Sequence, residues 1–336
     1  MAKKILFICG SLNQTTIMHQ ISVHMSEYDC YFTTYYADGF INRLSETGFL
    51  DFTILGGRFK KDTLNYLLAN RLNIDFGGNL FNYDLVYTCS DLIVPKNIIG
   101  TKIILVQEGM TDPENVMYYL VKKLKLPRYL ASTSTTGLSN LYDFFCVASE
   151  GYKELFVKKG VNGDKIVVTG IPNFDNCKKY LKNNFPQRNF VLVATSDSRE
   201  TFKYENRKKF IKDAIDIADG RKLIFKLHPN ENFDKATKEI KYLAPDADVY
   251  TEGNINDMIA NCDVLITKYS SVVYVGLALG KEVYSYFDLN ELKKQLPLQN
   301  KGTSAKNIAE VGKRLIGVRN PTPETLSKFK AQCTWN

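Results

Sequence analysis

The feature that most constrains the fold is a rhythm of short apolar runs alternating with longer stretches of helical periodicity. Runs such as Lys4–Cys9 and Lys102–Gln107 are rich in Ile, Leu, Val and Phe, and stretches such as Glu150–Lys159 follow them. Strands that alternate with helices are typical of parallel sheets covered by helices. We therefore expect an α/β protein.

The rhythm occurs twice, and residues 173–188 interrupt it. This stretch is polar, contains proline and resembles an interdomain linker. A chain of 336 residues also exceeds the usual size of one domain, about 100–200 residues. We expect two Rossmann-like domains facing a cleft. The predicted parts are an N-terminal domain at 1–172, the linker at 173–188, a C-terminal domain at 189–318 and a tail at 319–336 that packs back on the first domain.

The predicted elements follow the apolar runs and the helical periodicity. Predicted strands are Lys4–Cys9, Cys30–Tyr35, Phe52–Leu55, Leu85–Thr88, Lys102–Gln107, Phe144–Ala148, Ile166–Thr169, Phe190–Thr195, Lys222–Leu227, Asp248–Tyr250, Asp263–Thr267 and Glu282–Phe287. Predicted helices are Thr15–Glu27, Glu114–Leu126, Glu150–Lys159, Tyr204–Ala218, Ile255–Asn261, Val272–Leu279 and Ala305–Ile316.

Composition and charge limit the kinds of partner and the location that we expect for the protein. Most of the net charge of +8 lies in residues 171–336, which hold 27 Lys and Arg against 20 Asp and Glu. A basic half suits an anionic partner such as a nucleotide phosphate. No run of about 18 apolar residues suggests a membrane span, and the first apolar run is too short for a signal peptide. We expect a cytoplasmic protein with peripheral contact to the inner membrane face.

The seven cysteines predict neither disulfides nor metal binding. Their number is odd, and no pair has the C-x-x-C spacing of a metal site. Most adjoin apolar runs, so we expect small buried side chains. No His/Cys cluster indicates a catalytic metal, no G-x-G-x-x-G motif indicates a dinucleotide, and basic residues do not interleave with aromatic ones as in nucleic-acid binding. We expect no metal, cofactor or nucleic acid.

Two loops of the second domain suit a phosphate. Ligands of open parallel sheets bind outside the carboxyl ends of the strands. There, Ser270 and Ser271 stand where a helix must begin, beside free backbone N–H groups. Lys226 and His228 end another strand, on one side by the alternation of a strand, and can neutralise a phosphate leaving group. A helix cap and a structural histidine are the alternatives.

Other strand ends complete the predicted donor site. Thr195 ends the first strand of the second domain. The loop that holds Glu252 and Asn254 follows another strand, and we expect it to meet the base or ribose. In the first domain, the turn at 10–15 and His19 are placed to contact an acceptor, although helix capping explains much of that pattern.

Glu108 is the predicted general base. It follows a buried strand, and the Gly109 after it lets the backbone turn sharply. Inverting transfer needs one group to take the proton of the acceptor hydroxyl. Asp91 and Asp112 are the reserve candidates, and a capping or salt-bridged carboxylate is the structural alternative.

The order of these motifs resembles known bacterial GT-B transferases. A strand ending in K-x-H-P, followed some forty residues later by a strand ending in Ser-Ser, is similar to capsule Kdo transferases, sialyltransferases and CDP-glycerol glycerophosphotransferases. The segment 146–175 resembles the domain crossing of that group and of UDP-N-acetylglucosamine 2-epimerases. The resemblance covers about residues 84–290. It implies that His228, Ser270 and Ser271 meet donor phosphate, and that Glu108-Gly109 matches the acidic motif of sialyltransferases, although Gln107 stands where a second acid is common.

The resemblance implies a metal-independent, inverting glycosyltransferase. Its donor is a sugar linked to CMP, CDP or UDP, and its acceptor is a glycan or lipid-linked molecule of cell-surface polysaccharide synthesis. Three alternatives stay open: a hydrolysing sugar-nucleotide 2-epimerase, a CDP-alditol phosphotransferase and a non-catalytic binding module. The chain lacks the Glu-Ala-Gly-Leu-Arg pattern of the epimerases, which weakens the first alternative.

Overall fold

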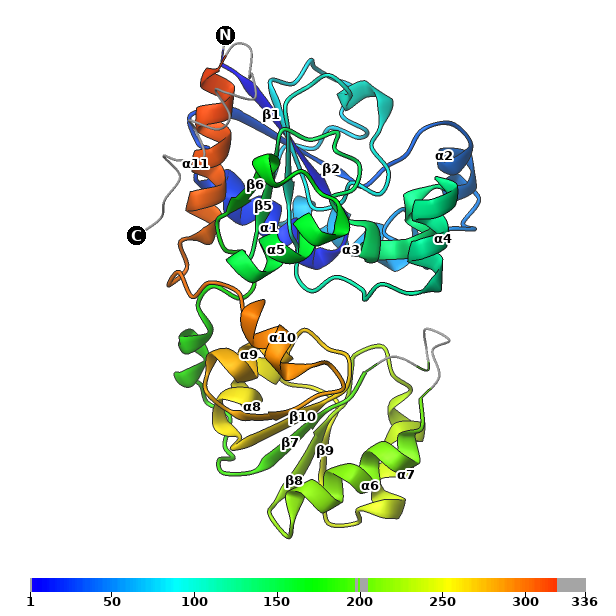
Figure 1. The fold of residues 1–336 in the computed structure, drawn as a ribbon, viewed down its shortest axis with the longest axis vertical. Helices are drawn as coiled ribbons and strands as arrows, with labels where there is room; N and C mark the ends of the chain where they lie inside the picture. Colours follow the sequence, from blue (N-terminus) through cyan, green and yellow to red (C-terminus); the bar gives the residue numbers. More distant parts are fainter. Residues whose placement is uncertain (1, 197–198, 200–204, 319–336) are drawn as a thin grey trace. The chain divides into compact units, whose positions relative to one another are not determined.

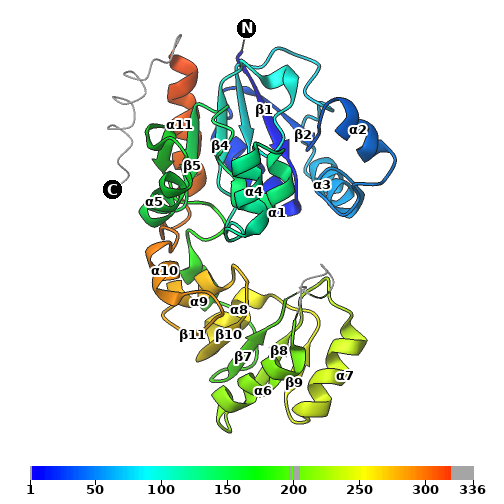
Figure 2. The same ribbon diagram turned by 45° about the vertical axis from the view of Figure 1, so that its right-hand side comes forward.

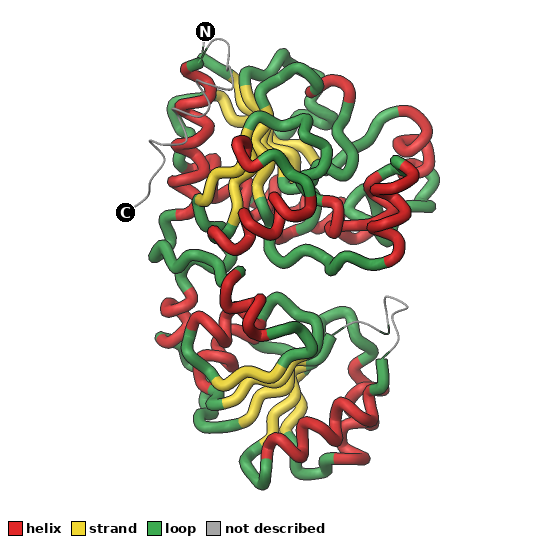
Figure 3. Tube along the Cα trace, in the orientation of Figure 1, coloured by secondary structure: helices red, strands yellow, loops and turns green. Residues whose placement is uncertain are grey.

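The computed structural model describes residues 2–196, 199 and 205–318. The chain divides into two compact units, which Figure 1 shows by sequence colour and Figure 2 after a turn. Unit 1 contains residues 1–175 and 300–336, and unit 2 contains residues 176–299. Figure 3 shows strands at the centre of each unit and helices around them.

Unit 1 is built on a parallel sheet of six strands in the order β2-β1-β3-β4-β5-β6. Its strands are β1 (Lys4–Cys9), β2 (Asp29–Thr34), β3 (Leu85–Thr88), β4 (Ile103–Val106), β5 (Phe144–Val147) and β6 (Ile166–Val168). Its described helices are α1 (Leu12–Val23), α2 (Gly39–Glu46), α3 (Gly57–Ala69), α4 (Val116–Leu124), α5 (Glu150–Lys159) and α11 (Ser304–Gly317), with the longest 3-10 segment, η2, at Arg128–Thr135.

Unit 2 repeats the plan with a parallel sheet of five strands in the order β11-β10-β7-β8-β9. Its strands are β7 (Val191–Ala194), β8 (Leu223–Lys226), β9 (Asp248–Tyr250), β10 (Val264–Thr267) and β11 (Glu282–Tyr284). Its described helices are α6 (Arg207–Ala218), α7 (Phe233–Leu243), α8 (Ile255–Asn261), α9 (Val273–Ala278) and α10 (Leu289–Lys294), preceded by the 3-10 segment η4 (Cys177–Leu181).

The predicted domain boundary differs from the compact units at α11. This helix was expected in the second domain, but its buried residues, Ile308 and Leu315 among them, belong to the core of unit 1. Gly312 explains the close approach, because a Cβ there would lie 1.8 Å from the Tyr87 hydroxyl of β3. Most of the predicted linker at 173–188 also belongs to unit 2, because this unit begins at Asn176. The predicted tail at 319–336 lies outside the described residues.

One predicted strand is wrong. Phe52–Leu55 forms a series of turns between α2 and α3, and Phe52 is 77% exposed. The run is only four residues long, and two glycines follow it directly. A short apolar run has too few residues to distinguish a strand from an anchored turn.

Candidate functional site

The carboxyl edge of the unit 1 sheet holds the Glu108 carboxylate between two side-chain donors. Glu108 follows β4, and Ser11 and Gln14 begin α1 after β1. The Ser11 hydroxyl donates to Oε1 at 3.0 Å and the Gln14 amide donates to Oε2 at 2.7 Å. Gly10 makes room, because a Cβ there would lie 2.1 Å from Gln14 Oε1. Both carboxylate oxygens are therefore oriented at a half-buried position.

Gln107 anchors the loop that carries Glu108. Its side chain is buried, its amide donates to the Gly109 carbonyl at 2.8 Å, and its carbonyl oxygen accepts from the Ala148 N–H at 2.9 Å. Gly109 does not have a positive φ, and a Cβ there would meet Phe174 at an ordinary 3.6 Å. Neither the backbone conformation nor the available space therefore requires a glycine at position 109.

The reserve candidate Asp91 has a structural role. Its side chain is 3% exposed and forms an ion pair with Arg128 at 2.9 Å. It also accepts from the Gly137 and Ser139 N–H groups at 2.9 and 3.0 Å. Asp112 is likewise bound, by the Thr133 hydroxyl at 2.8 Å. Both reserve candidates therefore hold loops of unit 1 together.

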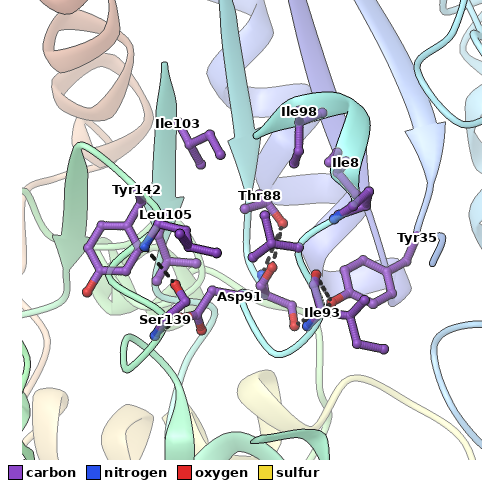
Figure 4. A pocket seen from close by; sticks show the side chains of 14 residues that line it. Ile8, Tyr35, Thr88, Asp91, Ile93, Ile98, Ile103, Leu105, Ser139 and Tyr142 are labelled. Atoms are coloured by element: carbon purple, nitrogen blue, oxygen red, sulfur yellow. Dashed lines mark hydrogen bonds between the residues drawn. The ribbon is translucent and has the colours of Figure 1, made fainter. Parts of the chain in front are cut away.

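Asp91 lines a small, mostly apolar pocket beside this edge (Figure 4). Ile8, Ile103 and Leu105 supply its apolar wall. The Tyr35 hydroxyl donates to the Ile93 carbonyl at 2.9 Å and accepts from the Ile93 N–H at 3.1 Å. Its polar side chains bond either to one another or, like Asp91 and Tyr142, to nearby residues of unit 1 such as Arg128 and Gly137, so the pocket supports the loop rather than offering catalytic groups.

At the carboxyl edge of unit 2, Glu231 orders the loop that holds His228. The His228 backbone N–H donates to Glu231 Oε2 at 2.9 Å and to the Thr195 hydroxyl at 3.1 Å, and Thr195 in turn donates to Glu231. His228 Nδ1 accepts from the Asn230 N–H at 3.3 Å. A neutral His228 ring with this bond carries its proton on Nε2, which makes Nε2 the donor.

Lys226 also binds backbone carbonyl groups at the carboxyl edge of the unit 2 sheet. Its Nζ donates to the Leu227 carbonyl at 2.9 Å and to the Thr251 carbonyl at 3.0 Å, and burial lowers its pKa. Two of its three N–H donors therefore join the loops after β8 and β9. In the second loop Glu252 is exposed, and the Asn254 side chain accepts from the Asn256 N–H as the cap of α8.

The sequence interpretation missed a buried set of charged residues beside this loop. Arg207, at the start of α6, forms ion pairs with Glu205 and Glu231, and Lys268 pairs with Glu205 at 3.2 Å. Burial lowers the pKa of Lys268. Arg207 Nη1 and Thr267 Oγ1 are buried without a hydrogen-bond partner within the described residues. The sequence could have indicated these residues only by their positions at strand ends. Glu231 follows His-Pro-Asn, and Lys268 comes directly after β10.

The serine pair precedes α9. Helix α9 begins at Val273 with Val272 as its cap residue, and no side chain caps it. Ser270 and Ser271 are half-buried, and their carbonyls accept from the Val273 and Tyr274 N–H groups at 3.2 and 3.1 Å. The pair therefore forms the turn that links the carboxyl end of β10 to the helix.

Three other sequence features have structural roles. His19 bonds to the Tyr66 hydroxyl at 3.0 Å between α1 and α3, and burial lowers its pKa. The described cysteines are free, all but Cys30 are buried, and burial raises the thiol pKa of Cys262 to about 12. Among the described residues, no cluster of His, Cys, Asp or Glu could hold a metal ion, and no helix is long and apolar enough to cross a membrane.

Two Rossmann-like parallel sheets define an α/β fold of the GT-B type, and solved structures share it. The UDP-GlcNAc 2-epimerase from Neisseria meningitidis bound to UDP-GlcNAc is 14% identical, with a TM-score of 0.56 and coverage of 93% of this chain and 100% of that chain. The S. aureus MnaA–UDP structure is 12% identical, with a TM-score of 0.57 and coverage of 95% and 99%. At these identities the likeness concerns the fold alone. The wall teichoic acid polymerase TagF aligns with a TM-score of 0.46 at 12% identity, covering 99% and 88%.

The family follows from the sequence match. Residues 100–291, more than half of the chain, match the family model described as CDP-Glycerol:Poly(glycerophosphate) glycerophosphotransferase. The chain belongs to this family, a family of transferases that act on nucleotide-linked donors. No curated protein matches the chain.

Proposed function

We propose that the chain transfers glycerol phosphate, or a related alditol phosphate, from a CDP-linked donor to a hydroxyl group of a glycan or lipid-linked acceptor. The observation that carries this proposal is the family match over 100–291. That range contains Glu108, the loop of His228 and the serine pair, which are the strand-end positions where ligands of parallel sheets bind. The CDP-alditol alternative thus takes precedence over sugar transfer.

The donor phosphates are assigned to the carboxyl edge of unit 2. His228 presents Nε2 as a donor, and Lys226 places positive charge at the same edge, whereas Lys268 and Arg207 are paired with Glu205 and Glu231. Arg207 Nη1 and Thr267 Oγ1, buried and without a hydrogen-bond partner among the residues that the structure describes, support an anionic ligand, because buried polar groups normally have partners. Ser270 and Ser271 offer hydroxyls after β10. Thr195 and Lys226 act by holding this loop, and Glu252 and Asn254 are placed for the nucleoside.

The chemistry requires one proton acceptor and one stabilised leaving group. The acceptor oxygen forms a bond to the distal phosphorus of the donor, and the bond from that phosphorus to the bridging oxygen breaks. Glu108 takes the hydroxyl proton, and CMP leaves with its new charge stabilised by the His228 Nε2 donor. This assignment needs no metal, so we expect activity to persist in EDTA.

Sugar transfer is the second candidate, because the Glu108-Gly109 pair resembles the acidic motif of sialyltransferases. The two reactions differ in the substrate that is consumed. Purified chain is incubated with CDP-glycerol, a CMP-linked sugar or UDP-GlcNAc, each with a hydroxyl acceptor, and the nucleotide and the acceptor mass are measured. Glycerol phosphate transfer predicts CMP release from CDP-glycerol and an acceptor heavier by one glycerol phosphate unit. Turnover of a sugar donor alone would overturn the proposal, and nucleotide release without an acceptor would indicate hydrolysis.

A further inference from the structure

Four charged side chains are buried together at the middle of the carboxyl edge of the unit 2 sheet. Glu205 and Arg207 lie at the start of α6, Glu231 lies in the loop after β8, and Lys268 follows β10. Strand β7, which precedes α6, lies between β10 and β8 (Figure 1). None of the four side chains is more than 8% exposed. Buried charges are costly unless they are paired and hydrogen-bonded, so the bonds of each carboxylate indicate its role.

Glu231 is held by hydrogen bonds on both carboxylate oxygens. Its Oε1 accepts from Arg207 Nη2, and its Oε2 accepts from the Thr195 hydroxyl and from the His228 N–H at 2.9 Å. The buried Asp91 of unit 1 is held in the same way, by a guanidinium and by two backbone N–H groups. Several hydrogen bonds to one carboxylate fix its position. Glu231 is therefore a structural group of the loop that holds His228.

Glu205, in contrast, is held by charge alone. Its Oε1 lies 2.9 Å from Arg207 Nε and 3.2 Å from Lys268 Nζ. Neither of its oxygens accepts a hydrogen bond from any residue that the structure describes. Its side chain is 1% exposed, so bulk water cannot supply the missing donors. Glu205 therefore neutralises the two cations without being fixed in place by hydrogen bonds.

The groups around Glu205 have donors that a carboxylate leaves unused. Arg207 Nη1 and Thr267 Oγ1 are buried without a partner in the described part of the chain, although buried polar groups normally have one. Lys268 Nζ lies 4.6 Å from the centre of the Phe210 ring, on the other side of which no second carboxylate is needed to hold it. The start of α6, a helix of 12 residues, also attracts negative charge. A phosphate group suits a guanidinium, an ammonium and a hydroxyl together, because it offers more acceptor oxygens than a carboxylate.

We propose that Arg207 and Lys268 form a phosphate-binding site that Glu205 occupies until the donor diphosphate displaces its carboxylate. The identity of the ligand as a diphosphate donor rests on the proposed function, whereas the exchange of one anion for another rests on the cluster itself. The two cations stay compensated throughout, because phosphate replaces Glu205 while Glu231 remains bonded to the His228 loop. As a competing anion, Glu205 lowers the affinity for the donor and favours release of the nucleotide.

Calorimetric titration of the full chain with CDP and with inorganic pyrophosphate tests the exchange. Glu205→Gln keeps the size of the side chain and removes the competing charge, so both ligands should bind at least about tenfold more tightly. Glu282→Gln is the matched control, because it removes the same charge from an exposed position at the start of β11, at the amino edge of the sheet. The control should bind both ligands as the parent chain does. Unchanged or weaker binding by Glu205→Gln would overturn the proposal.

A second variant removes both members of the pair, so that no uncompensated lysine stays buried if Glu205→Gln alone is unstable. Glu205→Gln with Lys268→Met should bind both ligands at least about tenfold more weakly than Glu205→Gln, because Lys268 is assigned to the phosphate. Equal affinities would contradict that assignment.

A crystal structure of the parent chain with CDP tests the exchange without any variant. Glu205 Oε1 should lie more than about 4 Å from Arg207 Nε, the limit of an ion pair, with a phosphate oxygen in its place. Bound CDP beside an intact 2.9 Å pair would overturn the proposal.

Pyrophosphate separates failure of this inference from failure of the proposed function, because it contains neither cytidine nor an alditol. Tighter binding of pyrophosphate by Glu205→Gln, without turnover of CDP-glycerol by the parent chain, would refute the proposed function and leave the exchange intact. Turnover of CDP-glycerol with equal ligand affinities of the parent chain and Glu205→Gln would refute the exchange alone. Absence of binding of either ligand to both chains would also overturn the exchange.

Discussion

The side-chain amide of Gln14 donates a 2.7 Å hydrogen bond to the carboxylate of Glu108, a residue 94 positions away in the chain. Together with Ser11, Gln14 connects the start of α1 to the loop after β4. The orientation of the candidate base therefore depends on a polar residue that carries no chemistry of its own.

Gln14→Ala should lower kcat about 10- to 100-fold, since a hydrogen bond to a charged group contributes about 1.5–3 kcal/mol. The KM for the donor should stay unchanged, because the donor is assigned to unit 2. Steady-state kinetics measure both values. Gln20→Ala, on an exposed position of α1, is the control. Equal kcat values for the two variants would remove Gln14 from the positioning of Glu108.

Glu108→Gln should reduce turnover by about 10²–10⁴, the usual contribution of a general base. The amide keeps the size of the side chain but cannot take a proton. The melting temperature and the CDP affinity should remain those of the parent chain. Glu154→Gln, at an exposed position of α5, serves as the control. A variant that melts early yet turns over normally would show that Glu108 is structural.

His228→Ala should reduce turnover by about 10²–10³, because a positioned donor to the leaving group is lost. The loop should persist, since its bonds to Glu231 and Thr195 use the His228 backbone. His24→Ala is the control, and single-turnover release of CMP is the measurement. Unchanged release would place the stabilising group elsewhere on this edge.

Glu231→Gln should destabilise unit 2 by about 1.5–3 kcal/mol, because a buried charge-assisted bond to Arg207 is lost and Glu205 alone then balances the guanidinium. The Arg207 side chain is 5% exposed. Glu291→Gln removes the exposed pair with Lys294 and should change stability by less than about 1 kcal/mol. Urea unfolding compares the two, and equal stabilities would contradict the structural role of Glu231.

The stability of unit 1 should rise between neutral and alkaline pH because of Lys159. This side chain is 3% exposed, and burial lowers its pKa below the usual 10.5. The unfolded chain then binds more protons between the two pKa values, so the free energy of unfolding increases with pH there. Lys159→Met should reduce this slope, whereas Lys158→Met, at the exposed neighbouring position, should keep it. Urea unfolding at several pH values gives the slopes, and equal slopes for both variants would refute the assignment.

Most strands could be predicted because buried parallel strands are short, continuous apolar runs. The bounds of β1, α5 and α8 agree with the prediction. Helices α2, α3, α7 and α10 were not predicted. Helix α2 has no buried residue, so no apolar stripe toward a core marks it in the sequence.

The sequence predicted where the candidate site residues lie but not which residues they bind. Strand ends identified Glu108 and His228, whereas the residues that hold these loops are distant in the sequence. Ser11 lies 97 positions from Glu108, and Arg207 lies 24 positions from Glu231. Lys226 was expected to face a ligand, and its bonds to two carbonyls appear only once the loops after β8 and β9 are in place.

The return of the chain to unit 1 at α11 has a consequence for synthesis on the ribosome. Domains fold as units while the chain emerges from its N-terminus. Unit 2, at 176–299, is complete before the helix at 304–317 that closes the core of unit 1 has been made. The part translated first is therefore the last to be finished, and until then the side of β3 that α11 covers, at Leu85 and Tyr87, stays open to water and to chaperones.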